Sequence, residues 1–309
     1  MDTTKKYDVI IIGGGPAGMS SAVWCSDLGL KPLLIDKSDR LGGQLWWIHN
    51  PISNYLGIQT ANGAQLATIF EKQTQNGDVE IITGQEVASA DLSTRTFQLG
   101  DRSFTGDAVI IASGVRRRRL GIPGEDRGLD WGILTSGARD REMVKGKRVV
   151  IVGGGDAALE NALILSGHAD QVTVIHRGAE FSARREFVDA ARGQSNVHFV
   201  LRANLLGIEG SEQVERAVID ASDGVRTIDC DAVLIRIGVE PNTDFLAGQV
   251  LLDDRRYVVV DTQLRTSKAG VWAVGDISGP IAMTIAGAVG HGAVAAASIY
   301  RSLREDATT

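Results

Sequence analysis

Residues 7–18 read YDVIIIGGGPAG, and this stretch decides the fold. Residues 7–12 are a mostly apolar run of the length of a buried strand. Residues 13–18 fit the pattern G-x-G-x-x-G, and residues 19–30 then fit a helix. Glycines in this pattern allow a tight turn, close approach of the backbone to a pyrophosphate, and close packing of the helix on the strand. The stretch therefore predicts a dinucleotide-binding βαβ unit.

The same pattern occurs a second time, 140 residues further along the chain. Residues 148–152 read RVVIV, residues 153–158 read GGGDAA, and a helical pattern follows. A helix that begins at such a turn offers free N–H groups and the positive end of its dipole to a phosphate. Two matches in the same context predict two dinucleotide-binding units.

The second strand of each unit ends in a different charge. In the first unit the strand at residues 32–35 ends in Asp36, 18 residues after Gly18, where a carboxylate accepts hydrogen bonds from an adenosine ribose. In the second unit the strand at residues 171–175 ends in His176 and Arg177, and a cation at that position suits a 2′-phosphate. The two units are therefore expected to bind different dinucleotides.

Length and composition limit the other functions. The 309 residues predict about two domains, and a formal net charge of −6 gives no general attraction to nucleic acid or to an anionic membrane. No apolar run approaches a membrane span, and the N-terminus does not resemble a signal peptide, so a cytoplasmic protein is expected. Glycine is in excess, at 37 residues. Because the only two cysteines are Cys25 and Cys230, the sequence offers no CxxC motif and no cysteine-based zinc site, and we predict no metal.

Taken together, these motifs resemble the low-molecular-weight thioredoxin reductases and their relatives among flavoproteins with two dinucleotide-binding domains. Other segments that match this family lie along nearly the whole chain. They are Gly42-Gly43-Gln44, Asn54-Tyr55-Leu56-Gly57, Ala112-Ser113-Gly114, Gly121-Ile122-Pro123-Gly124-Glu125 and Gly270-Val271-Trp272-Ala273-Val274-Gly275-Asp276. In this family the first unit binds FAD and the second binds NADPH.

The order of these segments implies an α/β fold with two Rossmann-like three-layer dinucleotide-binding domains, the second inserted into the first. FAD segments occur near both ends of the chain, whereas the second glycine turn lies between them. The resemblance thus implies a discontinuous FAD-binding domain, residues 1–117 and 244–309, and an NAD(P)H-binding domain, residues 118–243. The family also implies a homodimer.

The resemblance assigns cofactor-binding residues in both units. For FAD they are Gly13, Gly15, Pro16, Ala17, Gly18, Asp36, Lys37, Gly43, Gln44, Leu45, Asn54, Val87, Ala112, Ser113, Gly114, Gly275, Asp276, Met283, Thr284 and Ile285. For the pyridine nucleotide they are Gly153, Gly155, Asp156, Ala157, Ala158, His176, Arg177, Arg184 and Arg185. The family has more arginines directly after His176, so NADH or a second FAD remain alternatives to NADPH in the second unit.

One departure from the family concerns the active-site dithiol. Thioredoxin reductases of this type carry Cys-Ala-Thr-Cys-Asp-Gly before the second glycine turn, and this chain has Gly132 and Thr135 at the cysteine positions and Ser136 at the acidic one. A hydroxyl does not cycle between thiol and disulfide. We therefore expect no reduction of thioredoxin through this relay.

Three functions remain open at this stage. The first is an FAD enzyme that passes electrons from NADPH directly to ferredoxin, flavodoxin or a small molecule. The second is a disulfide reductase with a relocated cysteine, for which Cys230 is a candidate. The third is a flavoprotein that uses no pyridine nucleotide and holds another flavin in the second site. His49 and His291 are weak candidates for proton transfer near the flavin, and the arginine run at residues 116–119 is either a solvated linker or a docking patch for an acidic electron carrier.

Overall fold

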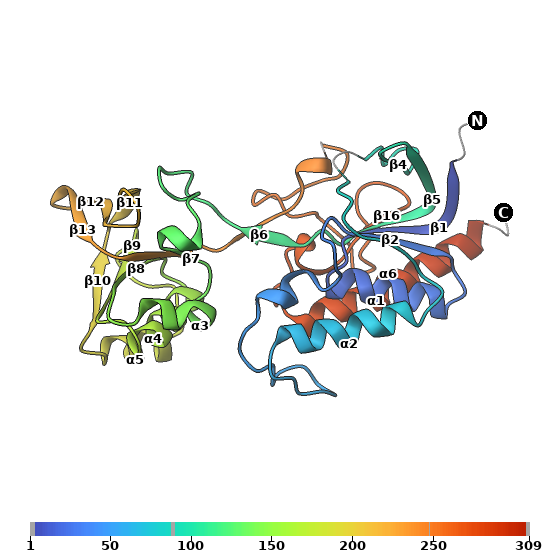
Figure 1. The fold of residues 1–309 in the computed structure, drawn as a ribbon. Coiled ribbons are helices and arrows are strands. Elements are labelled where there is room, and N and C mark those ends of the chain that lie inside the picture. The colour runs from blue at the N-terminus through green and yellow to red at the C-terminus, as the bar shows by residue number, and fades with distance from the viewer. Residues whose placement is uncertain (1–3, 88–89, 247, 307–309) are drawn as a thin grey trace. The chain divides into compact units, whose positions relative to one another are not determined.

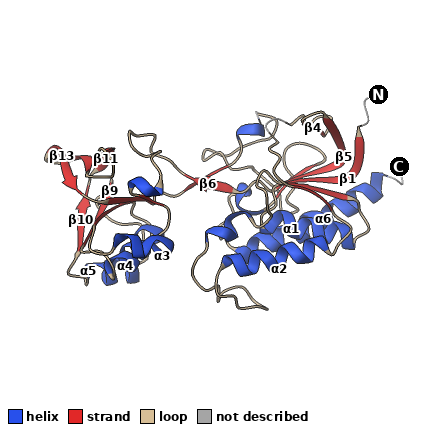
Figure 2. Ribbon diagram, viewed as in Figure 1, coloured by secondary structure: helices blue, strands red, loops and turns tan. Residues whose placement is uncertain are grey.

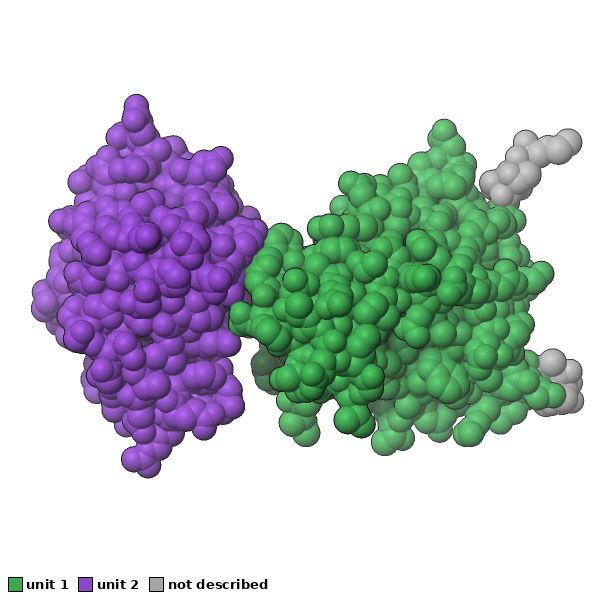
Figure 3. All heavy atoms as spheres, turned by 60° about the horizontal axis from the view of Figure 1, so that its bottom comes forward, with its two compact units in different colours: residues 1–116, 240–309 green, residues 117–239 purple. Residues whose placement is uncertain are grey.

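The chain folds into two compact units, which Figure 3 colours separately. The structure is a computed structural model that describes residues 4–87, 90–246 and 248–306. Unit 1 comprises Met1–Arg116 and Glu240–Thr309, and unit 2 comprises Arg117–Val239. The second unit is thus inserted into the sequence of the first.

Both unit boundaries differ from those expected from the sequence, by one residue at the first and by four at the second. The second difference has a local cause, because the segment that follows Val239 bonds to unit 1. The Asn242 N–H donates to Gly114 O at 3.0 Å, and Ser113 Oγ donates to Asn242 O at 3.0 Å. Residues 240–243 therefore belong with unit 1 rather than with the inserted unit.

Unit 1 contains a parallel sheet in the order β16-β5-β1-β2-β3, with β4 added antiparallel to β5 (Figure 1). Its strands are β1 (Lys5–Ile12), β2 (Pro32–Ile35), β3 (Glu80–Ile82), β4 (Thr96–Leu99), β5 (Arg102–Ile111) and β16 (Val271–Ala273). Its α-helices are α1 (Pro16–Asp27), α2 (Gly63–Gln75) and α6 (Ile285–Asp306). Its 3-10 helices are Gly43–Trp47, Asp244–Leu246 and Gly275–Ser278.

Successive side chains of the buried strands point to opposite faces of this sheet, so that a layer packs on each face. Val9 and Ile11 of β1 pack with helices α1, α2 and α6, which lie together on one face (Figure 2). Ile10 and Ile12 point the other way and pack with apolar residues from the segments 87–104 and 245–260. A fully buried isoleucine is worth roughly 1.5–3 kcal/mol, so the two-sided burial of β1 holds three layers together.

Unit 2 repeats this plan. Its main sheet is parallel, in the order β10-β9-β8-β14-β7, and a second, antiparallel sheet has the order β11-β12-β13. The strands are β7 (Ile133–Leu134), β8 (Arg148–Val152), β9 (Gln171–His176), β10 (Val197–Leu201), β11 (Asn204–Glu209), β12 (Arg216–Ala221), β13 (Gly224–Asp229) and β14 (Ala232–Ile235). The α-helices are α3 (Gly137–Asp140), α4 (Asp156–Ser166) and α5 (Arg185–Arg192), and the 3-10 helices are Leu129–Trp131 and Arg141–Val144.

The core of unit 2 again lies on both faces of the parallel sheet. Ile151 and Val174 pack against α4 and α5, whereas Val150 and Val152 pack against the antiparallel sheet β11-β12-β13. The unit is therefore a helix layer, a parallel sheet and an antiparallel sheet. The segments that join the units, β6 (Val115–Arg117) and β15 (Val239–Pro241), pair as a two-stranded sheet.

Strand register brings functional segments to one edge of each parallel sheet. In unit 1, Ile12 is level with Ile35 and with Ile111, so the turns after β1, β2 and β5 emerge together. In unit 2, Val152 is level with Ile175 and with Ile235. Ligands of open parallel sheets bind outside these carboxyl ends.

Candidate dinucleotide-binding sites

The first glycine turn follows β1 and is shaped by backbone contacts. Gly13 has a φ of +110°, and a Cβ atom there would overlap the carbonyl oxygen of Ala112. A Cβ on Gly18 would overlap the carbonyl oxygen of Gly13, because α1 packs directly on the turn. Gly15 is different, since its φ is −74° and a Cβ there would meet no atom within 4 Å. Packing within the protein explains Gly13 and Gly18, whereas no protein atom occupies the space beside Gly15.

The start of α1 is suited to an anion. Gly15 is the N-cap, Pro16 begins the helix, and the first turn carries no acidic side chain and no side-chain cap. The N–H groups of a helix's first turn have no partner within the helix, and the helix dipole adds positive potential there. A pyrophosphate above Gly15 would accept hydrogen bonds from these N–H groups and would be attracted by this potential.

Segments far apart in the sequence meet at this turn. A Cβ on Gly43 would lie 3.0 Å from Gly15 Cα, and a Cβ on Gly275 would lie 2.8 Å from Ala17 Cβ. Gln44 Nε2 donates to Asp276 Oδ2 at 3.4 Å. The structure therefore brings together four of the segments assigned to FAD, those around residues 13–18, 43–45, 112–114 and 275–276.

His291 belongs to the same cluster. Its Nδ1 accepts the Gly275 N–H at 3.2 Å, next to Asp276. Burial lowers the pKa of His291, although the Asp276 charge acts in the opposite direction. Burial raises the pKa of Asp276, while the Gln44 hydrogen bond and the charge of His291 lower it. With Nδ1 accepting a hydrogen bond, neutral His291 carries its proton on Nε2.

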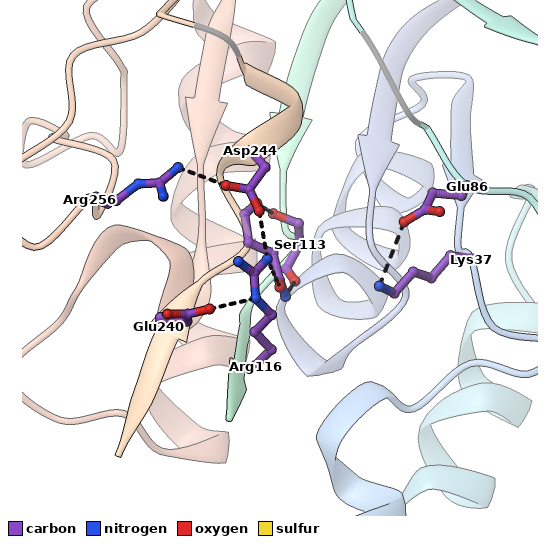
Figure 4. Close-up of polar contacts among 8 residues, drawn as sticks. Lys37, Glu86, Ser113, Arg116, Glu240, Asp244 and Arg256 are labelled. Atoms are coloured by element: carbon purple, nitrogen blue, oxygen red, sulfur yellow. Dashed lines mark hydrogen bonds and ion pairs between the residues drawn. The ribbon is translucent and has the colours of Figure 1, made fainter. Parts of the chain in front are cut away.

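The end of β2 forms a second part of this site. Asp36 is buried and accepts the Gly14 N–H at 2.5 Å and the Ser38 N–H at 2.7 Å. A carboxylate has about four acceptor positions, so acceptor positions for ribose hydroxyls remain. Lys37 turns toward Glu86, with Nζ and Oε1 3.8 Å apart (Figure 4). Buried Val87 follows Glu86 in the segment after β3.

Within the described residues, the other predicted FAD residues form no hydrogen bond or ion pair with this cluster, and their roles stay predictions. Asn54, Met283, Thr284 and His49 are exposed, and Ile285 is half-buried at the start of α6. Thr284 caps that helix, because its Oγ1 accepts the Gly287 N–H at 3.0 Å. Leu45 is buried in the core of unit 1.

The second glycine turn, after β8, is shaped by similar backbone contacts, but it has alanine at its third position. Gly153 has a φ of +146°, and a Cβ there would overlap the carbonyl oxygen of Arg236. Ala158 replaces the third glycine, and its methyl group lies 3.1 Å from where a Gly153 Cβ would be. A Cβ on Gly155 would meet only Ser182 Oγ, at 3.8 Å. As in unit 1, the middle of the turn is open to a ligand.

The loop after β9 folds back onto this turn. The N–H groups of Ser182 and Ala183 donate to Gly154 O at 2.8 and 3.0 Å. The His176 ring lies against Gly154, so that a Cβ there would overlap it, and His176 Nε2 is 3.0 Å from Glu180 O. His176 therefore has a packing role in this structure.

Arg184 and Arg185, which are predicted to bind the pyridine nucleotide, form ion pairs within the chain, and their role toward the nucleotide stays a prediction. Arg184 Nε pairs with Asp156 at 2.8 Å and Arg184 Nη1 with Glu186 at 2.9 Å, while Arg185 pairs with Asp189 at 3.5 Å. The physical reason is Asp156, the first residue of α4, which places a carboxylate beside the turn and draws Arg184 to it. Ala157 follows Asp156 in the first turn of that helix.

Sequence reasoning missed a cation that the fold places beside Arg177. Leu201 is level with His176 across β9 and β10, so Arg202 emerges next to Arg177. The Arg202 N–H donates to Gly178 O at 3.0 Å. In the described part of the chain neither guanidinium has an ion-pair partner. Only the strand order 10-9-8 could have indicated this pair.

Both cysteines are buried and free. Burial raises the pKa of the Cys230 thiol to about 12 and that of Cys25 to about 12. The thiolate is the reactive form of cysteine. Cys230, a predicted candidate for catalysis, is thus a core residue of unit 2 without thiolate character.

The arginine run is engaged within the chain. Arg116 pairs with Glu240 and Asp244, both at 2.8 Å, and Arg256 pairs with the other side of Asp244 (Figure 4). Arg118 donates to Val239 O at 3.3 Å. Arg119 pairs with Asp126, and Arg117 donates to Thr135 O. Each arginine of the run thus has a partner within the chain, and the docking patch considered from the sequence stays a prediction.

Residues 7–292 match the family described as pyridine nucleotide-disulphide oxidoreductase. The chain belongs to this family. It is 33% identical to a thioredoxin reductase of Rickettsia conorii, over 98% of this chain and 99% of the relative, and 32% identical to one of Mycolicibacterium smegmatis, over 99% of both.

Solved structures give the same result. The chain is similar to Lactococcus lactis thioredoxin reductase, with a TM-score of 0.85, 28% identity and coverage of 97% of this chain and 99% of that one. It is also similar to T. acidophilum thioredoxin reductase, with a TM-score of 0.83, 30% identity and coverage of 97% and 99%. The two Rossmann-like units predicted from the glycine turns are confirmed as this family's fold. The chain is an enzyme of a family whose members use FAD and a pyridine nucleotide.

The described residues contain neither a cluster of metal ligands nor a membrane-spanning helix. They contain no group of three or more His, Cys, Asp or Glu side chains placed to hold a metal ion. None of the helices in the described ranges has the length and apolar character that crossing a bilayer requires.

Proposed function

We propose that this enzyme takes hydride from NADPH onto FAD and delivers the electrons directly to an external acceptor, without a thiol relay. The observation that carries this proposal is the cysteine inventory. The chain has two cysteines, 205 positions apart, and both are buried. A dithiol that cycles with flavin needs two sulfurs within bonding geometry and a reactive thiolate. Cys25 and Cys230 do not suit this role, because each is buried in the core of a different unit and burial raises the pKa of each thiol to about 12.

Unit 1 supplies the FAD site in this proposal. The open face of Gly15 and the uncapped start of α1 suit the pyrophosphate, Asp36 suits the adenosine ribose, and Asp276 suits the ribityl hydroxyls. Bound flavin accepts a hydride and returns electrons singly or in pairs. The protein's own contribution is to orient it: Gln44 holds Asp276, and His291 holds the Gly275 backbone.

Unit 2 supplies the pyridine nucleotide site. Gly155 leaves room for a pyrophosphate, and the cationic pair Arg177 and Arg202 suits a 2′-phosphate, which supports NADPH over NADH. The ion pairs of Arg184 and Arg185 reduce the number of available cations, and this observation keeps NADH, or a second FAD with no pyridine nucleotide, as outcomes of the test.

The acceptor belongs to the same proposal. Thr135 and Ser136 stand where the family's dithiol segment would be, and their backbone N–H groups donate to Asp140 at 2.7 and 2.9 Å. This segment is held by hydrogen bonds and has no redox-active group. We therefore propose a carrier protein such as ferredoxin or flavodoxin, or a small molecule, as acceptor. A homodimer and a cytoplasmic location are part of the proposal on the strength of the family alone.

The experiment combines flavin stoichiometry with anaerobic reduction. We expect one FAD per chain, rapid bleaching by NADPH, reoxidation by ferricyanide, ferredoxin or flavodoxin, and no reduction of thioredoxin. The variant Gly155→Glu places a carboxylate at the pyrophosphate position of unit 2 and should keep its FAD but lose bleaching, while Arg216→Gln, on β12, is the matched surface control. Two flavins per chain, no bleaching by either nucleotide, or NADPH-dependent reduction of thioredoxin would each overturn the proposal.

A further inference from the structure

Two guanidinium groups of unit 2 meet at one carbonyl oxygen. Arg117 Nη1 and Arg236 Nη2 both donate to Thr135 O. Arg236 Nη1 also donates to Ile235 O at 3.0 Å. Two positive charges that bond to the same oxygen atom repel each other. The arrangement therefore needs a compensating negative charge.

The nearby carboxylate of Asp140 provides only part of that compensation, because its charge raises the pKa of Arg117 and of Arg236 by less than burial lowers them. Asp140 is buried, and its oxygens accept hydrogen bonds from Arg139 Nε at 2.6 Å, from the N–H groups of Thr135 and Ser136, and from Thr135 Oγ1 at 3.2 Å. Burial raises the pKa of Asp140, but these hydrogen bonds outweigh it and the pKa lies below its usual range. Asp140 is thus ionised and already saturated by Arg139 and the 135–136 segment.

Several other arginines of unit 2 have carboxylate partners. Arg148 pairs with Asp231 at 3.0 Å, and Arg216 pairs with Glu209 at 2.7 Å. Among the described residues, Arg117 and Arg236 have no ion-pair partner. Burial and, to a smaller extent, the charge of Arg117 lower the pKa of Arg236 to about 10, although the charge of Asp140 acts in the opposite direction. A half-buried cation beside a second cation is an unfavourable arrangement unless an anion joins them.

The pair lies where ligands of this fold bind. Ile235 ends β14 level with Val152, and Leu134 ends β7 level with Leu234, so Thr135 and Arg236 emerge at the carboxyl edge of the sheet. The backbone of Arg236 packs on Gly153 of the glycine turn. A ligand at this edge would meet both guanidinium groups.

We propose that Arg117 and Arg236 form an oxyanion-binding site that takes a phosphate, sulfate or carboxylate group. Each guanidinium has five N–H donors; Arg236 uses one on each terminal nitrogen for protein carbonyls, and Arg117 uses one. The remaining donors suit the oxygens of one anion, which would offset the repulsion between the cations. The anion comes either from the bound dinucleotide or from a separate anionic ligand such as the acceptor.

The test is residue-resolved modification of the holoenzyme by phenylglyoxal, read by peptide mass spectrometry. Sulfate replaces chloride at constant ionic strength. At ten times its dissociation constant, sulfate should slow labelling of Arg117 and Arg236 about tenfold, because only the free site reacts. Labelling of Arg192, which is exposed at the C-terminal end of α5, should change little. Equal protection of all arginines, or none at these two, would overturn the proposal.

Variants and a second ligand complete the design. Arg236→Gln should abolish sulfate protection of Arg117, Arg236→Lys should retain part of it, and the control Arg216→Gln should leave it unchanged. Should Arg236→Gln not fold, Arg117→Gln with labelling at Arg236 gives the same test. Protection by NADPH, with sulfate competing, assigns the anion to the dinucleotide; sulfate binding beside bound NADPH assigns it to a separate ligand. The site does not require that NADPH binds, so failure to bleach the flavin would contradict the proposed function alone.

Discussion

Gly15 and Gly18 separate ligand binding from folding within a single turn. A Cβ on Gly15 meets nothing within 4 Å and its φ is −74°, whereas a Cβ on Gly18 would overlap Gly13 O. We expect Gly15→Ala to leave the stability of the apoprotein unchanged and to lower its affinity for FAD, because the methyl group occupies the pyrophosphate's approach. Gly18→Ala should destabilise the apoprotein by about 1–3 kcal/mol through overpacking.

The measurement is chemical denaturation of the apoprotein, followed by FAD titration of each variant. Equal loss of stability in the two variants would contradict this division of roles. Gly57→Ala is a poor control because its φ is +102°; Gly128→Ala, at a φ of −76° with nothing within 4 Å, is a suitable one.

His291 makes the flavin unit sensitive to acid. Its Nδ1 accepts the Gly275 N–H, and protonation would turn that nitrogen into a donor and remove the hydrogen bond. Burial lowers the pKa of His291 below its ordinary 6.5, so the folded protein binds this proton less tightly than the unfolded chain does. Its contribution to stability is therefore complete above pH 6.5 and is lost as the pH falls through the lower folded value.

The variant His291→Asn tests this, because an amide oxygen accepts the same N–H but does not titrate. Between pH 7.5 and 5, we expect the wild-type free energy of unfolding to fall by about 1 kcal/mol more than that of His291→Asn, the value of one hydrogen bond. His291→Ala should lack the bond at every pH. If the free energies of unfolding of wild type and His291→Asn depended on pH in the same way, this role of His291 would be contradicted.

At the scale of elements, we expect the ends of β9 and β10 to determine the choice of nucleotide. Arg177 and Arg202 emerge side by side, while Arg184 is bound by Asp156 and Glu186. A charged hydrogen bond is worth about 1.5–3 kcal/mol, so Arg202→Gln and Arg177→Gln should each raise the dissociation constant of NADPH by about tenfold or more. The affinity for NADH should change little.

Arg185→Gln is the matched control, because Arg185 is exposed and pairs with Asp189. The measurement is equilibrium binding of NADPH, NADH and 2′,5′-ADP. A larger loss of NADPH affinity in Arg185→Gln than in Arg202→Gln would show that the loop after β9, rather than the strand ends, binds the 2′-phosphate.

These elements also show what the sequence can predict. The glycine turns, the strands before them and the insertion of one unit in the other are local patterns, and each was predicted with little error. Arg202 and the Arg117–Arg236 pair depend on which strands become neighbours, and no local pattern encodes that order. The ion pair of Arg184 with Asp156, 28 positions earlier, is equally hidden from sequence reasoning, and the role of Arg184 as a phosphate ligand stays a prediction.

At the scale of the whole molecule, the two units use one plan with opposite charges at corresponding places. The helix after the first turn begins without an acidic residue, whereas the helix after the second begins with Asp156, which Arg184 neutralises. The second strand ends in Asp36 in unit 1 and in Arg177 in unit 2. This difference supports the proposal that the same backbone forms two dinucleotide sites of different preference.

The complete chain should work without sulfur nucleophiles. Cys25 and Cys230 are fully buried and small, so Cys25→Ala and Cys230→Ala leave small cavities and should together lower stability by about 1–3 kcal/mol. Because no proposed step uses a thiol, the double variant should retain NADPH-dependent reduction of ferricyanide and of the carrier protein within about twofold, measured below its melting temperature. Loss of turnover with FAD content and bleaching by NADPH intact would place a cysteine between flavin and acceptor, and would restore the disulfide chemistry that gives this family its name.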